Sequence, residues 1–226
     1  MNFEKLGRSY LGTAATTYDD ERANLEKWAS EQRIVEDLLA ALPAGSSVVD
    51  IPVGTGRFVD AYHRLHLVPT GMDISPDMIA LAARKAQRLG LTMPVQIADI
   101  RSIDATDGAF DTAVCICFLN WVDIHGVRAA FRELVRVARH SLIVSIRHYV
   151  PFRKLDPMTP QGFLQWSLQL AARAHKAMNP DSLRVHEEAD IVAMFHDFGL
   201  YLRCQVPVVP RKYGTDYCIY MLEKSQ

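Results

Sequence analysis

Apolar residues follow two alternating patterns from residue 46 onward. Short apolar runs with few interruptions, such as 46–51 (SSVVDI) and 110–119 (FDTAVCICFL), are typical of strands buried on both faces of a sheet. Between such runs, segments such as 75–90 and 126–138 carry apolar residues at every third or fourth position, which is typical of amphipathic helices. This alternation predicts an α/β fold with a doubly wound, mostly parallel sheet.

The complete pattern predicts seven strands. Five precede the last third of the chain, at 46–51, 68–74, 93–100, 110–119 and 141–149, and helices are expected at 18–42, 57–65, 75–90, 126–138, 162–178 and 187–199. Two further apolar runs, 200–209 and 216–223, are joined by a short link that contains Gly214. A short glycine-containing link between two strands predicts an antiparallel hairpin at the C-terminal end of the sheet.

Two segments do not follow the alternation. The first is the helical region that precedes the first strand, and the second, 150–185, holds four prolines around one predicted helix. We therefore expect a single domain over 1–226, with an N-terminal helical lid segment at 1–45 and an inserted cap at 150–185.

Composition and charge indicate which classes of protein the chain can belong to. The chain has 226 residues, 49% of them hydrophobic, which is enough for one sizeable core. Its 25 basic and 26 acidic residues give a net charge of -1, so we expect no nucleic-acid partner. No apolar run is long enough to span a membrane or to act as a signal peptide, which predicts a cytoplasmic protein without a membrane span.

Cysteine and histidine spacing predicts no metal site. The four cysteines lack paired ligand spacing and are expected to be reduced thiols; they are Cys115, Cys117, Cys204 and Cys218. His63 and His66 share a predicted helix face but have no third partner.

The first predicted strand ends in an acid and a glycine loop, VVDIPVGTGRF at 48–58. In an open α/β sheet, ligands bind outside the carboxyl ends of the strands, next to this first turn. Gly54 and Gly56 allow the backbone to approach a ligand, and Asp50 can accept a hydrogen bond from a hydroxyl or ammonium group. Val59 stands where a dinucleotide fingerprint requires a third glycine or alanine, so the loop is a poor match to that motif.

Two more acids end predicted strands. Asp73 follows Gly56 at about the distance at which an acid binds a ribose diol in such folds. Asp99 ends the third strand and can accept from an exocyclic amine, with Ile74 and Ile100 as apolar cover for a flat ring. Each acid alone also fits a solvated strand end or a helix cap, so their agreement is what indicates a nucleoside site.

With these motifs the chain resembles the class I S-adenosylmethionine-dependent methyltransferases, over about 18–147 and again in the terminal hairpin. The resemblance rests on VVDIPVGTGRF, GMDISPDMI, IADI and FDTAVCICFLNWVD, although Pro52 replaces the usual glycine. It implies a Rossmann-like methyltransferase fold and S-adenosylmethionine as cofactor. The cofactor-binding residues that it implies are Tyr18, Arg22, Asp50, Gly54, Gly56, Asp73, Ile74, Asp99, Ile100 and Phe118.

The resemblance also implies methyl transfer, which we expect to go to oxygen on a small-molecule or terminal acceptor group. Basic residues near the end of the fifth strand suit an anionic acceptor, and the predicted substrate-binding residues are Trp121, Arg147 and Tyr149. A hydroxyl acceptor needs a base, for which the candidates are His125 and His148.

Two other functions stay open on sequence alone. One is an NAD(P)-dependent oxidoreductase with a Rossmann core, against which Val59 and the terminal hairpin argue. The other is a non-catalytic module that binds S-adenosylmethionine without an acceptor pocket. The fourth strand ends in CFLNW and lacks the Asn/Asp-Pro-Pro-aromatic motif of enzymes that methylate nucleic-acid bases.

Overall fold

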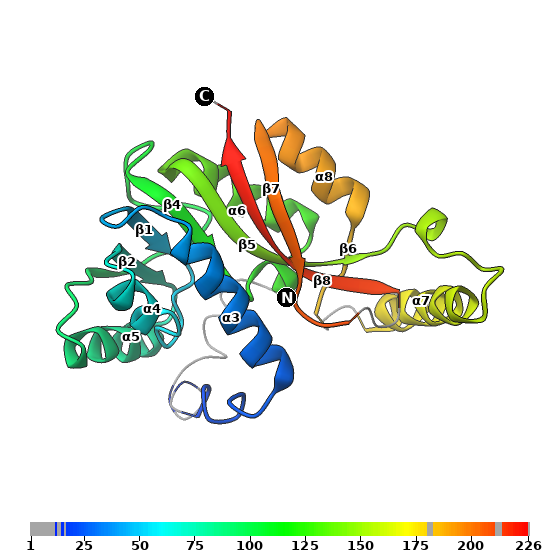
Figure 1. The fold of residues 1–226 in the computed structure, drawn as a ribbon, viewed down its shortest axis with the longest axis horizontal. Coiled ribbons are helices and arrows are strands. Elements are labelled where there is room, and N and C mark those ends of the chain that lie inside the picture. Colours follow the sequence, from blue (N-terminus) through cyan, green and yellow to red (C-terminus); the bar gives the residue numbers. More distant parts are fainter. Residues whose placement is uncertain (1–11, 13–14, 16, 180–182, 211–213, 226) are drawn as a thin grey trace.

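The computed structural model describes residues 12, 15, 17–179, 183–210 and 214–225. A twisted sheet runs through the molecule, with helices against both faces and one helix, α7, set apart beside the first residues of β8 (Figure 1). No helix in these described ranges combines the length and the apolar character needed to cross a membrane.

The sheet confirms the predicted topology. Its strands are β1 (Ser47–Asp50), β2 (Val68–Asp73), β3 (Val95–Ile97), β4 (Phe110–Cys115), β5 (Ala138–Tyr149), β6 (His186–Glu187), β7 (Leu200–Pro207) and β8 (Thr215–Lys224). The order is β3-β2-β1-β4-β5-β8-β7, and β6 pairs with the last two residues of β5. The pairings β1–β2, β1–β4, β2–β3 and β4–β5 are parallel, whereas β8 runs antiparallel to both β5 and β7. The carboxyl ends of β1, β2 and β4 therefore meet at one edge, where the order reverses.

The helices begin and end close to the predicted positions. They are α3 (Glu26–Ala40), α4 (Val59–Arg64), α5 (Pro76–Arg88), α6 (Ile124–Val137), α7 (Pro160–Met178) and α8 (Glu188–Asp197), with short 3-10 turns at Leu119–Trp121 and Phe152–Lys154. Polar caps explain three of the starts, since the side chains of Ser75, Asp123 and Thr159 accept hydrogen bonds from backbone N–H groups in the first turns of α5, α6 and α7.

Three local predictions were wrong. The first helix begins at Glu26 rather than near residue 18, because the polar stretch 17–24 has no apolar face to bury and forms turns. The third strand ends at Ile97, so Asp99 and Ile100 lie in the loop that follows it. The two-residue strand β6 was missed because it is too short to show a periodic pattern.

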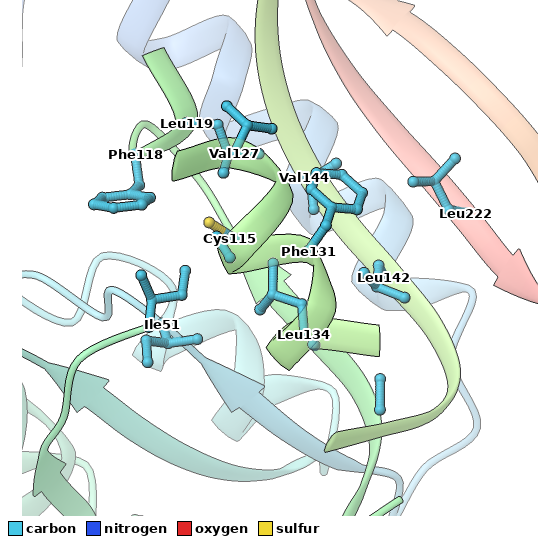
Figure 2. Close-up of a cluster of buried hydrophobic side chains, with 14 of the residues drawn as sticks. Ile51, Cys115, Phe118, Leu119, Val127, Phe131, Leu134, Leu142, Val144 and Leu222 are labelled. Atoms are coloured by element: carbon cyan, nitrogen blue, oxygen red, sulfur yellow. The ribbon is translucent and has the colours of Figure 1, made fainter. Parts of the chain in front are cut away.

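Hydrophobic clusters hold helices to both faces of the sheet, and a third, smaller cluster holds α5 through Ala82 and Ala86. On one face, α6 and α8 pack on β4, β5 and β8, and Figure 2 shows Val127, Phe131 and Leu134 of α6 beside Leu142 and Val144 of β5. On the other face, α3 and α4 pack on the central strands through a second cluster. Burial on both faces explains why the central strands are almost continuously apolar.

Candidate functional site

Three adjoining cavities open along the edge where the parallel strands end. The central cavity lies over the ends of β1, β2 and β4, and its lining residues are Tyr18, Trp28, Asp50, Pro52, Val53, Gly54, Thr55, Arg57, Phe58, Asp73, Ile74, Met78, Ile116, Cys117, Phe118 and Trp121. The edge cavity is lined by Ile51, Pro52, Asp73, Ile74, Ala98, Asp99, Ile100 and Phe118. The basic cavity is lined by Tyr18, Arg22, Leu25, Lys27, Trp28, Glu31, Cys117, Asn120, Trp121, Arg147, Leu183 and Tyr217.

Shared walls join the cavities into one continuous site. The central and edge cavities have Pro52, Asp73, Ile74 and Phe118 in common. The central and basic cavities have Tyr18, Trp28, Cys117 and Trp121 in common. A ligand in the central cavity therefore has a flat apolar neighbour site on one side and a cationic neighbour site on the other.

Asp50 is the last residue of β1 and lies at the bottom of the central cavity. Its Oδ2 accepts a hydrogen bond of 2.9 Å from the hydroxyl of Tyr62. The pKa of Asp50 is raised to about 7: burial raises it most, the Tyr62 hydrogen bond lowers it, the charge of Asp73 raises it and that of Arg57 lowers it. A positively charged ligand group in this cavity would therefore be drawn to Asp50 and would favour its ionised form.

Asp73 ends β2 and ties the glycine loop to the sheet. Its Oδ2 accepts from the backbone N–H of Gly54 at 3.0 Å, and its Oδ1 accepts from that of Ser75 at 2.9 Å. Burial raises the pKa of Asp73, and the backbone hydrogen bonds from Ser75 and Gly54 lower it. The carboxylate is thus fixed between the central and edge cavities, and each oxygen keeps a second lone pair for a ligand hydroxyl.

The two glycines of the loop have different roles. Gly54 has φ +56° and open space where a Cβ would stand, so its bare backbone borders the central cavity. Gly56 has φ +77°, and a Cβ there would lie 2.9 Å from the Cα of Ala82 in α5. Gly54 therefore borders the ligand space, whereas Gly56 lies outside the three cavities and allows α5 to pack against the loop.

Asp99 lines the edge cavity together with Ile100. Its carboxylate is paired with Arg101, whose Nη2 lies 2.5 Å from Oδ2. Partial burial acts to raise the pKa of Asp99, but the hydrogen bonds and charge of Arg101 outweigh it, so the pKa is lowered. The sequence predicted Asp99 beside the apolar residues Ile74 and Ile100, but it did not predict the ion pair between Asp99 and Arg101.

A buried polar cluster missed by sequence reasoning lies between the central and basic cavities. Glu31 of α3 is buried, and its Oε2 accepts from Arg57 Nη1 at 2.6 Å. Its other oxygen accepts from the hydroxyl of Tyr217 in β8, whose oxygen also lies 3.0 Å from Ser145 Oγ. The Arg57 guanidinium stacks on Trp28, 3.4 Å from the ring centroid. The pairing of Trp28 and Glu31 on one helix face was visible in the sequence, but their distant partners were not.

Three cationic side chains line the basic cavity. Lys27 Nζ lies 4.3 Å and the Arg147 guanidinium carbon 5.0 Å from the centroid of the Tyr217 ring. Within the ranges that the structure describes, neither cation has a carboxylate within 4.0 Å, whereas Arg22 lies 3.5 Å from Glu21. Burial lowers the pKa of Arg147, and electrostatic interactions with Tyr217 and Glu31 act in the opposite direction. Two of the three cations are thus available to an anionic ligand.

The candidate bases lie outside the three cavities. Arg147 faces the basic cavity, and because successive strand residues point to opposite faces, His148 points to the other side of the sheet. There its ring is buried, with Nε2 2.7 Å from the hydroxyl oxygen of Tyr220, and burial lowers the pKa of His148. His125 is exposed at the start of α6.

Of the remaining predicted site residues, two line the cavities and one lies outside them. Phe118 lines the central and edge cavities, and Trp121 lines the central and basic ones. Tyr149 is outside all three, because its ring is buried under the guanidinium of Arg173 at 4.0 Å.

The sequence from 48 to 141 matches the profile of a family described as "Methyltransferase domain". The matched segment runs from β1 into β5. Among solved structures, the chain is similar to a magnesium protoporphyrin IX methyltransferase from Synechocystis PCC 6803 with bound SAH, with 16% identity and a TM-score of 0.74 over 99% of this chain and 100% of that one. The same neighbour is also known with SAM bound.

Two curated relatives match part of the chain. A dTDP-4-amino-2,3,4,6-tetradeoxy-D-glucose N,N-dimethyltransferase from Saccharopolyspora spinosa is 28% identical over 66% of this chain and 55% of its own length. A phosphatidylethanolamine N-methyltransferase from Cereibacter sphaeroides is 31% identical over 46% of this chain and 52% of its own length. The chain thus spans about half the length of these relatives.

Proposed function

We propose that the protein transfers the methyl group of S-adenosylmethionine to an oxygen of an anionic small-molecule acceptor that binds in the basic cavity. The observation that carries this proposal is a pair of cations, Lys27 and Arg147, that have no ion-pair partner among the described residues and lie in a cavity that shares a wall with the central one. The cofactor supplies an electrophilic methyl group on a sulfonium, and the protein binds, orients and excludes water.

The residues of the central and edge cavities fit this cofactor. Asp50 and the Gly54 backbone are suited to its cationic amino-acid end, and Asp73 to the ribose hydroxyls. Ile74 and Ile100 provide flat apolar walls for the adenine, with Asp99 at its rim. Pro52 lines both cavities through its ring and has no N–H to donate.

An anionic acceptor removes the need for a base. No histidine of the described residues lines the three cavities, and the Glu31 carboxylate is already engaged by Arg57 and Tyr217. An oxygen nucleophile that is negatively charged before reaction has no proton to lose. Lys27 and Arg147 would hold such a group beside Trp121 and Cys117, at the junction with the central cavity.

We further propose that the N-terminal segment closes the site. Tyr18 and Arg22 line its rim, and Asp19 accepts a 2.7 Å hydrogen bond from Thr55 of the glycine loop. The proposed cap at 150–185 contributes less to the cavities, because Leu183, which follows α7, is its one described residue in their lining.

Methylation of an amine is a second candidate. Its support is the naming of the two curated relatives, whose acceptors are a dTDP-linked amino sugar and phosphatidylethanolamine. Both acceptors also carry phosphate, so they agree with a cationic acceptor cavity. The identity of the methylated atom in the product distinguishes the two candidates.

The test is an acceptor screen followed by one substitution. Purified protein is incubated with S-adenosylmethionine and with benzoate, 4-hydroxybenzoate, phenyl phosphate or O-phosphoethanolamine, and S-adenosylhomocysteine is quantified by mass spectrometry. For any productive acceptor, Arg147→Gln should raise KM about 10- to 100-fold, the usual effect of losing a hydrogen bond to a charged group, and leave the cofactor Kd unchanged. Arg139→Gln, at the opposite end of β5 in a surface pair with Asp111, is the matched control. Loss of cofactor binding in Arg147→Gln would place the acceptor elsewhere.

A further inference from the structure

The helix α7 packs its polar side against the rest of the protein. Gln169 is fully buried, and its Nε2 donates to the carbonyl oxygens of Val150 at 2.8 Å and Gly214 at 2.7 Å. One turn earlier, Gln165 Oε1 accepts from the backbone N–H of Gly214 at 2.9 Å. These hydrogen bonds attach α7 to the end of β5 and the start of β8.

Arg173 extends the same polar stripe by another turn. Its two terminal nitrogens contact the carboxylate of Glu187 at 2.5 and 2.9 Å, and its guanidinium covers the ring of Tyr149. Because residues four apart lie on one helix face, Gln165, Gln169 and Arg173 form a single stripe that faces the protein.

The apolar side of α7 faces solvent. Phe163 is 55% exposed, Leu170 42% and Met178 74%, and Leu164 beside them is 53% exposed. A helix on a protein surface normally has the opposite orientation, with its apolar stripe on the core. An apolar stripe along the whole of a projecting helix marks an interaction site (Figure 1).

Charge around the stripe argues against a lipid surface as the occupant. Helices that lie on membranes carry Lys and Arg on their polar face, where they meet anionic head groups. Here the polar face is occupied by the hydrogen bonds to the protein, and its arginine is already paired with Glu187.

The spacing of the stripe suits a second copy of the same helix. Phe163, Ser167, Leu170, Ala174 and Met178 follow one another at intervals of four, three, four and four residues, as in a helix-pairing seam. In an antiparallel pair centred between 170 and 171, Phe163 faces Met178, Ser167 faces Ala174 and Leu170 faces Ala171. Large residues therefore meet at the two ends of the pair, and small residues leave room for Leu170 at its centre.

Charge sets the direction of such a pair. The charged residues of α7 lie in its last two turns, at Arg173, His175 and Lys176, whereas Asp156 lies just before its first turn. A parallel pair would bring the two Lys176 ammonium groups together, and an antiparallel pair separates them and aligns the helix dipoles favourably.

We propose that α7 is a homodimerisation helix that pairs antiparallel with α7 of a second copy about a two-fold axis between Leu170 and Ala171. One helix pair is small beside the roughly 800 Å² that each partner buries in a standard interface. The dimer is therefore expected to dissociate on dilution.

The first test is sedimentation velocity of the full chain across a range of concentrations. The wild type should shift from monomer to dimer as concentration rises, and Leu170→Glu should remain monomeric because it places two carboxylates beside the axis. Val68→Glu is the matched control, since Val68 is also exposed, at 54%, but lies at the start of β2. A wild type that is monomeric throughout, or a Leu170→Glu variant that dimerises as the wild type does, would overturn the proposal.

The second test addresses the register. Under mild oxidant, Ala171→Cys should form an intermolecular disulfide because its two copies are about 1.5 Å apart along the helix axis. Ala174→Cys should not, because its copies are about 10 Å apart along that axis, beyond disulfide reach. The wild type under the same oxidant controls for the native cysteines. Equal cross-linking of the two variants would contradict this pairing, and α7-dependent binding of monomer to phosphatidylcholine–phosphatidylglycerol vesicles would assign the stripe to lipid instead.

Discussion

At the scale of single residues, two carboxyl groups line the central cavity. Burial makes the ionised form of each less favourable, and a cationic ligand would offset that penalty. Asp50 and Asp73 are both buried, and burial raises the pKa of each. The nearby Arg57 is engaged by Glu31, so its charge only partly offsets the two acids. The site is therefore electrostatically prepared for a positively charged molecule.

Asp73→Ala should weaken binding of S-adenosylmethionine by about 1–3 kcal/mol, because it removes hydrogen-bond acceptors next to the proposed ribose position. Isothermal titration calorimetry measures the change. Asp104→Ala, at an exposed acid, is the control and should bind as the wild type does. Unchanged affinity in a folded Asp73→Ala protein would remove Asp73 from the cofactor site.

Asp50→Asn should alter how stability depends on pH. The folded-state pKa of about 7 lies above the ordinary value of 3.8, so the folded chain holds the proton more tightly than the unfolded chain. The free energy of unfolding of the cofactor-free wild type should therefore fall, by up to about 4 kcal/mol, as pH rises from about 4 to about 7, and level off above. The variant should lack this contribution.

Urea unfolding of both proteins at several pH values measures the difference. The stability of Asp50→Asn relative to the wild type should increase through this window and be greatest near pH 8. A difference between the two proteins that does not vary with pH would contradict the raised pKa. Cofactor affinity of the wild type should decrease below about pH 7, because a cationic ligand favours ionised Asp50.

The sequence was most informative for residues that share a local motif. Asp50, Gly54 and Asp73 were predicted because each follows a strand whose apolar run is plain in the sequence. Lys27 and Tyr217 were missed because their proximity depends on how α3 and β8 pack, which no local pattern encodes. His148 was predicted as a candidate base beside Arg147, but strand alternation separates their side chains.

At the scale of elements, the glycine loop and α5 pack so closely at Gly56 that no side chain fits between them. Gly56→Ala must accept both an unfavourable φ and a Cβ 2.9 Å from the backbone of Ala82. Gly90→Ala shares a positive φ of +66° but meets no atom within 4 Å. We expect Gly90→Ala to lower the free energy of unfolding by about 1–2 kcal/mol, and Gly56→Ala by about 1–3 kcal/mol more. Chemical denaturation of both variants measures these losses of unfolding free energy. Equal losses in the two variants would show that a Cβ at position 56 does not clash with Ala82.

The orientation of α7 illustrates what periodicity cannot establish. Its residues were predicted to be helical, and they are, but the spacing of apolar residues does not establish which side of the helix packs against the protein. The buried hydrogen bonds of Gln169 place the polar side there. Such an orientation depends on the position of the Val150 and Gly214 carbonyl groups beside α7, which the sequence does not reveal.

At the scale of the whole molecule, cofactor binding should stabilise the folded chain by mass action. At a concentration 100 times its Kd, S-adenosylmethionine or S-adenosylhomocysteine should add about 2.7 kcal/mol to the free energy of unfolding. Thermal unfolding with each ligand and with NAD in parallel measures the shift. NAD should leave the midpoint unchanged, and a shift with NAD alone would contradict the cofactor assignment.

The hydrogen bond between Tyr217 and Glu31 joins the first described helix to the last strand, 186 residues apart in the chain. Both residues line the basic cavity, so that cavity has walls from the two ends of the fold. During synthesis, the glycine loop and its acids emerge from the ribosome well before β8. A nascent chain can therefore assemble its central cavity before β8 exists, but the buried carboxylate of Glu31 lacks one of its partners until β8 has been made.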